Sequence, residues 1–517
     1  MSARGTPWRG ALREGAPWRR HGAAPAAATS RTRAAPGGLA AGALRSLLAP
    51  VVLLVPLALP VLVAGCASMA PPYERPAAPV PQRFPMAPAA DERAVAAERL
   101  DWQQFIVDER TRRLVALALA NNRDLRVAAL NIEAARAQAG LRDADRWPTL
   151  GAGVNSTRQS SGAVVTSLYT AGLQVTAYEL DVFGRLRSAS DAAAAQVLAS
   201  AQARQAVQIG LVAAVANASV ALAADDEALR VAREALATRE ESLRLVRLRF
   251  ELGAAAEPDL RQAESLLESA RVALVQAERQ RALDDNALAL LVGQALPADL
   301  PAAAGVADAA RWSAPAQWLV ALPSQVLTRR PDVRAAEQQL IAANANIGAA
   351  RAAFFPRITL TGSAGSASSQ LSGLFRGGSW GWSIAPQLLA TVFDAGRNES
   401  NLELAQVNRE IALAQYERAI QSAFREVADA LAGRATFGAQ LQAQQRLVEA
   451  ETARTRLADL RYRNGVASHL DLLDAQRSLL AAQLALVQAQ AQTVQNTLTL
   501  YKVLGGGWSE AQASRSP

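Results

Sequence analysis

Hydrophobic and polar positions along this chain follow two different periods, and the first is helical. Residues 187–251 contain no proline and one glycine, and residues 398–463 contain no proline and two glycines. Alanine dominates their apolar stripes, which favours helix formation and close approach between helices. At a rise of ~1.5 Å per residue, each segment predicts one helix of about 100 Å. Helices of this length indicate a coiled, tube-like or stalk-like body.

Each long helix is followed by a short segment that reverses the chain. These segments read ELGAAAEPD from residue 251 and RNGVASHLD from residue 463. Gly253 and Gly465 suit the left-handed position just after a helix, and Pro258 and Ser468 suit the start of the next one. The pattern predicts a helical hairpin in each half of the chain, with one long arm and one shorter arm.

The second period is two residues, and it begins where prolines stop a helix. Pro148 and Pro356 precede segments in which small, polar and apolar residues alternate, and each segment has an alternating partner further along the chain. Such alternation is typical of β-strands with two different faces. The sequence predicts two β-hairpins, at about 148–181 and 356–394.

The last of these strands has one apolar face. Trp380, Trp382 and Ile384 lie on one side, with Gly381 and Ser383 between them. Aromatic residues near one end of an alternating strand are typical of the lipid-facing side of a membrane barrel. An ordinary half-buried hairpin of a soluble domain is the favoured interpretation for any single strand. Four strands in two matching hairpins, flanked by very long helices, favour the barrel.

Four strands cannot close a barrel, and an open sheet edge is not tolerated in lipid. Several copies of the chain must therefore contribute strands, and three copies would supply 12, an acceptable even number, above a tube of helices. The expected fold class is an α+β membrane protein. Its 12-stranded transmembrane β-barrel is trimeric, with four strands per protomer, and is continuous with a long α-helical barrel.

The chain contains an internal tandem repeat. Residues 249–280 align without a gap on residues 461–492, at an offset of 212. Residues 124–148 align on residues 332–356, at an offset of 208. Two copies in the same order imply a protomer with approximate twofold symmetry.

The body of the chain therefore divides into two structural repeats. We expect the first at 101–305 and the second at 306–507. Each contains a helix, a β-hairpin and a long helical hairpin, in that order. Residues 508–517 are expected to form a flexible C-terminal tail.

Residues 1–65 are expected to be a lipoprotein signal peptide. An arginine-studded region precedes the apolar run SLLAPVVLLVPLALPVLVAGC, which ends at Cys66 and has small residues before the break. The ending resembles a bacterial lipobox, so lipidation of Cys66 is favoured over a buried small side chain. The proline-rich residues 66–100 should form an extended N-terminal tether, with ordered structure starting near Trp102.

Charge and composition exclude several classes of function. The first 65 residues hold eight of the 54 basic residues and one of the 46 acidic residues, which leaves 46 basic against 45 acidic residues in the mature chain. A nearly neutral chain lacks the excess of basic residues that is typical of nucleic-acid-binding proteins. Cys66 is the one cysteine, so no disulfide framework is expected.

The sequence contains few of the residues and motifs that enzymes use for catalysis. The two histidines are His21, in the leader, and His469, and no nucleophile, phosphate-loop or His/Cys metal motif is present. Chemistry by carboxylates alone is unsupported, and we expect no enzyme activity, no cofactor and no metal. His469 lies at a helix start, where a solvent-exposed turn residue is the favoured interpretation and a pH modulator is the alternative.

A short polar stripe begins the helix after the second turn. In LDLLDAQR, residues 470–477, the side chains of Asp471, Asp474 and Arg477 share one side of the helix. In the first repeat Asp259 matches Asp471, whereas neutral residues replace the other two. From spacing alone, a cap-region charge at Asp471 and a solvated partner at Arg477 are favoured.

Six segments together carry a resemblance to a known family. They are the GC pair at Cys66, the segment WQQF…RTRRLVALALANNRDLRVAALNIEAARAQ from Trp102, ELDVFGRLR at 179–187, RRPDVRAAEQQLIAANANIGAARAAFFP at 329–356, FDAGR at 393–397 and LDLLDAQRSLL at 470–480. With these segments the chain resembles the outer-membrane efflux protein family, the TolC/OprM-like ducts, and in particular its lipoprotein branch. The resemblance covers about the whole mature chain.

The resemblance implies a homotrimer whose barrel lies in the outer membrane and opens into a periplasmic α-helical barrel. It implies the exit duct of a tripartite efflux system, which passively conducts drugs or other small solutes. The expected partners are a periplasmic adaptor (membrane fusion) protein, an inner-membrane transporter of the resistance-nodulation-division class and outer-membrane lipid. The protein is therefore expected in the outer membrane, lipid-anchored through Cys66 and extending into the periplasm.

The resemblance also changes the interpretation of the polar stripe. It implies that Asp471 and Asp474 face the pore at its closed periplasmic end, where Arg477 holds neighbouring helices through polar contacts. Three copies would place six carboxylates around a narrow mouth, which should attract cations and resist anions.

Two alternatives remain from the sequence. A lipid-anchored periplasmic coiled-coil adaptor or scaffold without a pore explains the helices and Cys66, but leaves the four alternating strands unexplained. A protein-secretion duct of the same fold differs only in its partner.

Overall fold

The computed structural model of the chain describes residues 68–86, 100–314 and 324–506. The predicted signal peptide at 1–65, Cys66 and the predicted tail at 508–517 lie outside the described residues. The chain divides into two compact units, Met1–Ala64 and Gly65–Pro517, and every described residue belongs to the second.

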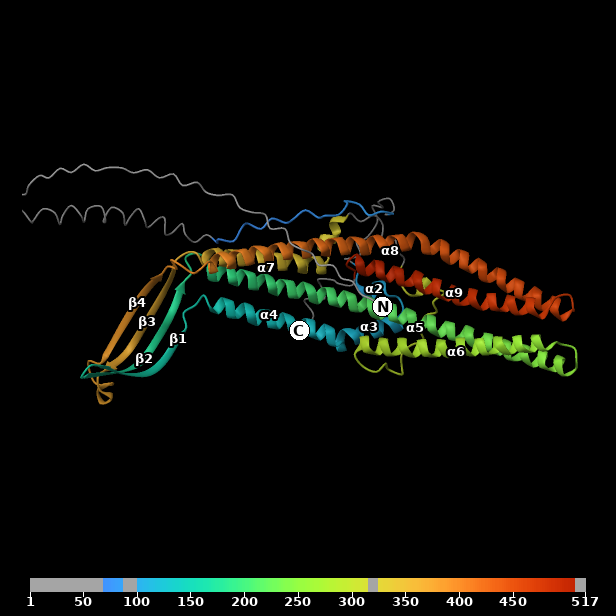
Figure 1. Cartoon of the computed structure of the whole chain (residues 1–517), viewed down its shortest axis with the longest axis horizontal. Helices are drawn as coiled ribbons and strands as arrows, with labels where there is room; N and C mark the ends of the chain where they lie inside the picture. The colour runs from blue at the N-terminus through green and yellow to red at the C-terminus, as the bar shows by residue number, and fades with distance from the viewer. Residues whose placement is uncertain (1–67, 87–99, 315–323, 507–517) are drawn as a thin grey trace, which may run out of the picture. The chain divides into compact units, whose positions relative to one another are not determined.

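The two halves of the described chain contain the same main elements in the same order (Figure 1). The first half has α2 Trp102–Phe105, α3 Glu109–Asn121, α4 Arg123–Ala144, β1 Leu150–Ser161, β2 Val164–Leu180, α5 Arg185–Glu251 and α6 Glu257–Val292. The second half has the short 3-10 turns η2 Ala309–Arg311 and η4 Ser324–Arg329, then α7 Pro331–Ala352, β3 Arg357–Ser368, η5 Leu371–Gly373, β4 Trp380–Leu389, α8 Arg397–Arg463 and α9 His469–Val503.

The long helices start and end within two residues of the predicted bounds. Helices α5 and α8 have 67 residues each, and their return arms α6 and α9 have 36 and 35. Each long helix follows a strand and ends at a hairpin turn, so it runs from the sheet to the far end of the helical body (Figure 1). Helix α5 packs along α4, α6, α7 and α9, and α8 packs along α7 and α9.

The hairpin turns form as the residue pattern predicts. Gly253 and Gly465 follow the long helices with φ of 71° and 74°, a conformation that costs glycine little. Ser468 caps α9 in a capping box, with its hydroxyl accepting from the Asp471 amide. The turn residues thereby fix where each long arm ends and each short arm begins.

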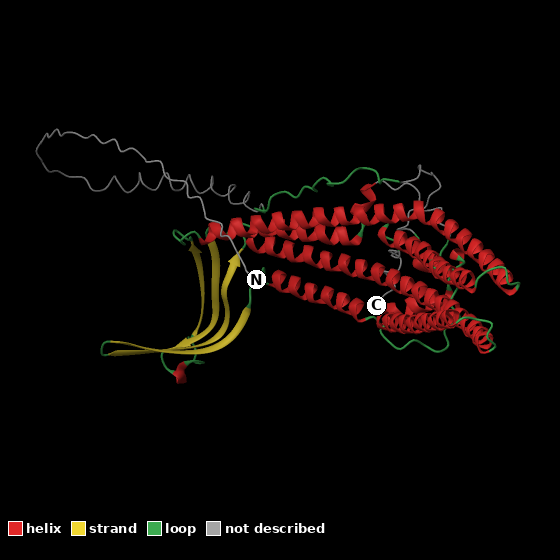
Figure 2. Cartoon of the chain, turned by 45° about the vertical axis from the view of Figure 1, so that its right-hand side comes forward, coloured by secondary structure: helices red, strands yellow, loops and turns green. Residues whose placement is uncertain are grey.

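The four strands form one antiparallel sheet in the order β1-β2-β3-β4. The central β2–β3 pairing joins the two halves of the chain, and a bulge lies between Val175 and Tyr178. Strands β1 and β4 are the outer strands of this sheet. Figure 2 shows the strands curving strongly along their length.

The largest hydrophobic cluster lies among α2, α3, α5, α7, α8 and α9, away from the sheet. Phe105 stacks on Tyr501 with ring centroids 3.9 Å apart, and Trp312 and Tyr416 are also almost fully buried. Among the described helices, α5 contains a stretch long and apolar enough to cross a membrane, but 61% of that stretch is buried inside the protein. That burial is typical of a core helix.

Within the proline-rich segment, the described residues 68–86 contain no helix or strand and are packed onto the helices. The buried Glu337 of α7 accepts from Arg75 Nε at 2.6 Å and from Tyr73 OH at 3.1 Å. Phe84 stacks on Phe424 of α8 at 4.8 Å. The prediction that ordered structure starts near Trp102 is therefore wrong. A proline-rich pattern indicates an extended backbone, but it does not reveal a buried carboxylate elsewhere that needs a partner.

Candidate functional site

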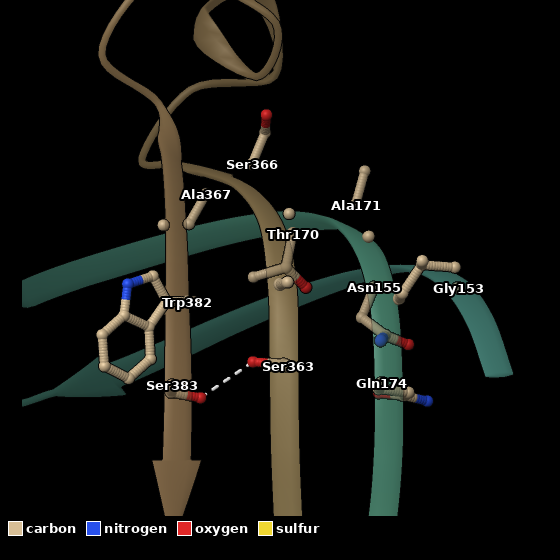
Figure 3. Close-up of a pocket in the computed structure, with 15 residues that line it drawn as sticks. Gly153, Asn155, Thr170, Ala171, Gln174, Ser363, Ser366, Ala367, Trp382 and Ser383 are labelled. Atoms are coloured by element: carbon tan, nitrogen blue, oxygen red, sulfur yellow. Dashed lines mark hydrogen bonds between the residues drawn. The ribbon is translucent and has the colours of Figure 1, made fainter. Parts of the chain in front are cut away.

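The sheet has two chemically different faces. The register aligns Gly153 with Gly172, Gly172 with Gly365 and Gly365 with Gly381, so one glycine from each strand forms a row across the sheet. On the same face, Ser363 and Ser383 are paired and their hydroxyl oxygens lie 2.8 Å apart (Figure 3). This face carries small and polar residues.

The opposite face carries the apolar residues that the sequence singled out. Trp380, Trp382 and Ile384 are exposed by 68%, 68% and 63%. In a soluble protein such a patch would ordinarily be covered. One polar face and one exposed apolar face are what a channel wall needs, with water on one side and lipid on the other.

Two glycines of the row mark a close approach between the central strands. A Cβ added to Gly172 would lie 2.4 Å from the carbonyl oxygen of Ala364, and one added to Gly365 would lie 2.3 Å from that of Ala171. An added Cβ atom would contact the neighbouring backbone because the two strands lie close together on the polar face. These two positions of the polar face therefore need glycine.

A second candidate site lies near the turn of the second helical hairpin. Arg454 of α8 donates from Nη2 to Asp474 Oδ2 of α9 at 2.7 Å, and Arg477 donates to the other carboxylate oxygen at 2.6 Å. Arg454 also contacts Glu451 at 3.2 Å. The hydrogen bond from Arg454 is the main reason that the pKa of Asp474 lies below its ordinary value. Asp474 is therefore a carboxylate held between two arginines.

Asp471 has a different local role. Its carboxylate accepts from the backbone N–H of Ser468 at 3.3 Å and completes the capping box. The structure thus brings Asp474 and Arg477 together, and places Asp471 at the helix start as the cap-region interpretation predicted. Its side chain is exposed in the single chain.

Arg454 was not among the residues predicted from the sequence. The repeat offset of 212 could have found it, because Arg454 and Asp474 correspond to Ser242 and Gln262 in the first repeat. A charged pair in one copy is replaced by two neutral polar residues in the other. The two hairpin ends are therefore electrostatically different.

His469 is buried, with 7% of its surface exposed, so the prediction of a solvent-exposed turn residue is wrong. Its Nε2 lies 3.4 Å from Ser242 Oγ of α5, and its ring packs on Tyr462 at 4.8 Å. Tyr462 in turn accepts a hydrogen bond from Arg249 of α5 at 2.7 Å. The helical period alone does not predict which side of the first turn of α9 packs against the other hairpin. Here the side that carries His469 packs against α5.

Burial is the main cause of a lowered pKa at His469. Asp259, the first-repeat counterpart of Asp471, acts in the opposite direction from the first turn of α6, and Arg249 and Arg239 add to the lowering. Arg239 also donates to Gln476 of α9. The two hairpins are therefore joined near their ends by a small polar and aromatic cluster that favours a neutral histidine.

Within the described ranges, no group of three or more His, Cys, Asp or Glu side chains is arranged to hold a metal ion. The arrangement of the chain consists of a two-faced sheet at one end of the long helices and a charged, cross-braced hairpin turn at the other (Figure 1).

Comparison with known proteins gives one consistent result. The family model described as "Outer membrane efflux protein" matches residues 114–294 and 322–506. The chain is 44% identical over 468 residues to the probable efflux pump outer membrane protein TtgC of Pseudomonas putida, covering 88% of this chain and 96% of that protein. It is 44% identical over 460 residues to the outer membrane protein OprJ of Pseudomonas aeruginosa, covering 87% and 95%.

A solved structure shares the fold. The open state of the MtrE outer membrane channel of Neisseria gonorrhoeae superposes with a TM-score of 0.77 at 40% identity. The match covers 85% of this chain and 98% of the MtrE chain.

Proposed function

The chain belongs to the outer membrane efflux protein family, and from this premise we propose how its sheet, helices and hairpin ends operate together. It is an outer-membrane exit duct of a tripartite efflux pump, and its family is one of channels, not of enzymes. Three copies join their sheets into a 12-stranded barrel whose polar face lines the pore, and the long helices continue the duct into the periplasm.

The observation that carries this proposal is the four-stranded sheet with an outer strand on each side. Strands β1 and β4 each pair on one side within the chain, and β4 is exposed along all ten residues. Unpaired backbone groups cannot remain at an open edge in lipid, so β4 of one copy must pair with β1 of the next. The face that carries small and polar residues supports an interior lined by such side chains.

The second hairpin supplies the gate in this proposal. Asp471 and Asp474 face the closed periplasmic mouth, and Arg454 and Arg477 hold Asp474 in place. Arg454 braces α8 against α9 within one hairpin. His469 lies beside this gate and couples it to the first hairpin.

Cys66 supplies a lipid anchor, and a periplasmic adaptor and a resistance-nodulation-division transporter complete the pump. A Cys66→Ser variant should lose palmitate labelling, because the chain has no other cysteine. Part of the trimer should remain in the membrane through its barrel. The wild-type protein serves as the positive control. If the wild-type protein takes up no palmitate label, the proposal of a lipid anchor at Cys66 is wrong.

The two-repeat organisation, 101–305 and 306–507, also belongs to the proposal. Equal lengths of α5 and α8 and matching hairpins in both halves support it. The substrates proposed are drugs or other small solutes, because some relatives are named as toluene or antibiotic efflux proteins.

The test combines mass and conductance. The purified full chain in detergent should have the mass of three chains and should conduct ions across a planar bilayer. A coiled-coil adaptor or scaffold would give no conductance and no heat-modifiable barrel. A stable, water-soluble monomer without affinity for bilayers would contradict the duct.

A further inference from the structure

Two aspartates meet between the arms of the first helical hairpin. Asp225 belongs to α5 and Asp284 to α6, and these two helices pack side by side (Figure 1). The Oδ2 atom of Asp225 is buried and accepts no hydrogen bond from any donor in the described part of the chain. Asp284 accepts one from Gln280 Nε2 at 3.3 Å. A buried carboxylate oxygen without a donor is unfavourable, so an ionised Asp225 destabilises this contact.

The neighbouring charges do not neutralise the two aspartates. Arg281 of α6 is close enough to act on Asp225, but its Nε donates to Asp226 at 2.5 Å. Helix α3 also packs on α5, and its Arg110 donates to a backbone carbonyl in the segment after α6. Helix α9 packs on α5 as well, and its residues 478–501 include no charged side chain. No printed cation contact therefore compensates Asp225 within the described residues.

A proton on Asp225 would satisfy both carboxyl groups. Burial, a hydrogen bond to Asp284 and the negative charges of Asp284 and Asp226 raise the pKa of Asp225 to about 7, and Arg281 acts in the opposite direction. Two carboxyl groups this close do not ionise together without a cost. The protonated Asp225 can donate to the Asp284 carboxylate, which makes one hydrogen bond between α5 and α6.

The second hairpin has no ionisable pair at the corresponding place. At the offset of 212, Asp225 and Asp284 correspond to Phe437 of α8 and Asn496 of α9. These two side chains lie together, because a Cβ added to Gly433 would be 2.8 Å from Phe437 Cε2 and 2.5 Å from Asn496 Oδ1. Asn496 donates to a backbone carbonyl of α8 at 3.0 Å. The two arms therefore meet at this level in both hairpins, and the aspartates are specific to the first.

We propose that Asp225 and Asp284 form a proton-binding site, in which one shared proton joins the two arms of the first hairpin. Release of this proton to water leaves two facing carboxylates and weakens the contact between α5 and α6. A rise in pH then loosens the first hairpin at this level and leaves the second unchanged. The site lies within a single chain, so it does not depend on the proposed duct.

Infrared difference spectroscopy of the purified full chain detects the proton directly. The wild-type protein at about pH 5.5 should show the carbonyl band of a protonated carboxyl group, and half of this band should be lost near pH 7. Asp225→Asn should remove the band. Asp284→Asn should move its midpoint to lower pH, because the neutral amide can donate to the Asp225 carboxylate. Asp285→Asn, one residue further along α6, is the matched control and should change neither the band nor its midpoint.

Hydrogen exchange measures the effect on the hairpin. The pKa of Asp225 returns to about 3.9 where the arms separate, so the stabilisation is complete below about pH 4 and is lost as the pH rises through about 7. Local opening of α6 around Asp284 should therefore increase by up to about tenfold per pH unit below pH 7 and level off above it, after correction for intrinsic exchange. Asp225→Asn should abolish this increase. The stretch of α9 around Asn496 is the internal control and should not show it.

Several results would overturn the proton site. They are a wild-type protein without a band that titrates between about pH 5.5 and 8, a band that persists in Asp225→Asn, and an opening of α6 that does not depend on pH. Both asparagine variants keep the size of the side chain, so Asp284→Asn provides an independent check if Asp225→Asn does not fold. A wild-type protein that shows the band but neither trimer mass nor conductance would contradict the duct and leave the proton site intact.

Discussion

Arg454 of α8 and Asp474 of α9 are joined by a 2.7 Å hydrogen bond, about two and a half turns before α8 ends and about one and a half turns after α9 begins. The bond braces the two arms of one hairpin, and Arg477 holds the second carboxylate oxygen. In the first hairpin the same two positions are Ser242 and Gln262. The two hairpins of each copy therefore differ in charge at these positions.

The first prediction concerns the brace. Asp474→Ala combined with Arg477→Ala should raise single-channel conductance and weaken cation preference, because the proposed gate would lose both a carboxylate and the contact proposed to narrow its mouth. Arg454→Ala alone should raise conductance while keeping the cation preference, since the carboxylate remains. Planar-bilayer recordings measure both quantities. Gln262→Ala, at the position that matches Asp474, is the control and should change neither. If the double variant equals wild type in both respects, these residues do not lie at the aperture.

The second prediction concerns pH at His469. Its lowered pKa means that the packed hairpins favour the neutral ring, so its contribution to stability is complete above about pH 6.5 and is lost as the pH falls through the lowered value. Hydrogen exchange at the ends of α5 and α9 should therefore be flat from pH 8 to 6.5 and should accelerate below it, after correction for intrinsic exchange.

Two variants check this assignment. His469→Gln should remove the acceleration. Asp259→Asn should leave the onset near pH 6.5 but make the acceleration larger and extend it to lower pH, because Asp259 raises the histidine pKa while Arg239 and Arg249 lower it. An unchanged pH profile in His469→Gln would assign the effect to another group.

The third prediction concerns the glycine row. Gly172→Ala or Gly365→Ala should destabilise the sheet by about 1–3 kcal/mol, because the added methyl meets the neighbouring backbone. Gly153→Ala and Gly381→Ala are matched controls in the same row, with nothing closer than 3.8 Å. The temperature at which the oligomer dissociates on a gel should fall for the first pair alone. Equal decreases of the dissociation temperature in all four variants would show that the close approach at Gly172 and Gly365 is not the cause.

The fourth prediction concerns the packed N-terminal segment. Arg75→Ala should lower stability by about 1–3 kcal/mol, because the buried Glu337 carboxylate would keep only Tyr73 as a hydrogen-bond partner among the described residues. Thermal unfolding in detergent measures the loss. Arg75→Ala with Glu337→Gln should recover part of it, and Glu74→Ala, next to the pair, should be neutral. A double variant less stable than Arg75→Ala would show that the carboxylate itself is not the cause.

Much of the fold could be predicted because it is encoded locally. Proline and glycine placement fixed the ends of α5 and α8 to within two residues, and two-residue alternation found the hairpins that contain β2 and β4. Ser468 signalled the start of α9 directly. These features depend on residues close together in the chain.

The missed features depend on which helices meet. Arg454 lies on a different helix from Asp474, and its role appears only when α8 and α9 are placed side by side. His469 is buried by α5, and residues 68–86 are held by Glu337, which lies more than 250 positions away along the chain. Periodicity describes one element at a time, so it could not assign these contacts.

The equal lengths of α5 and α8 have a consequence for the span of the cell envelope. Both helices leave the sheet and turn back after 67 residues, so the two hairpin ends of each subunit reach the same depth. Lengthening one helix alone by two turns would offset the ends by roughly 11 Å and leave half of the rim out of reach of a docking protein. The distance that the duct bridges therefore depends on the lengths of both α5 and α8, and the two helices must change length together.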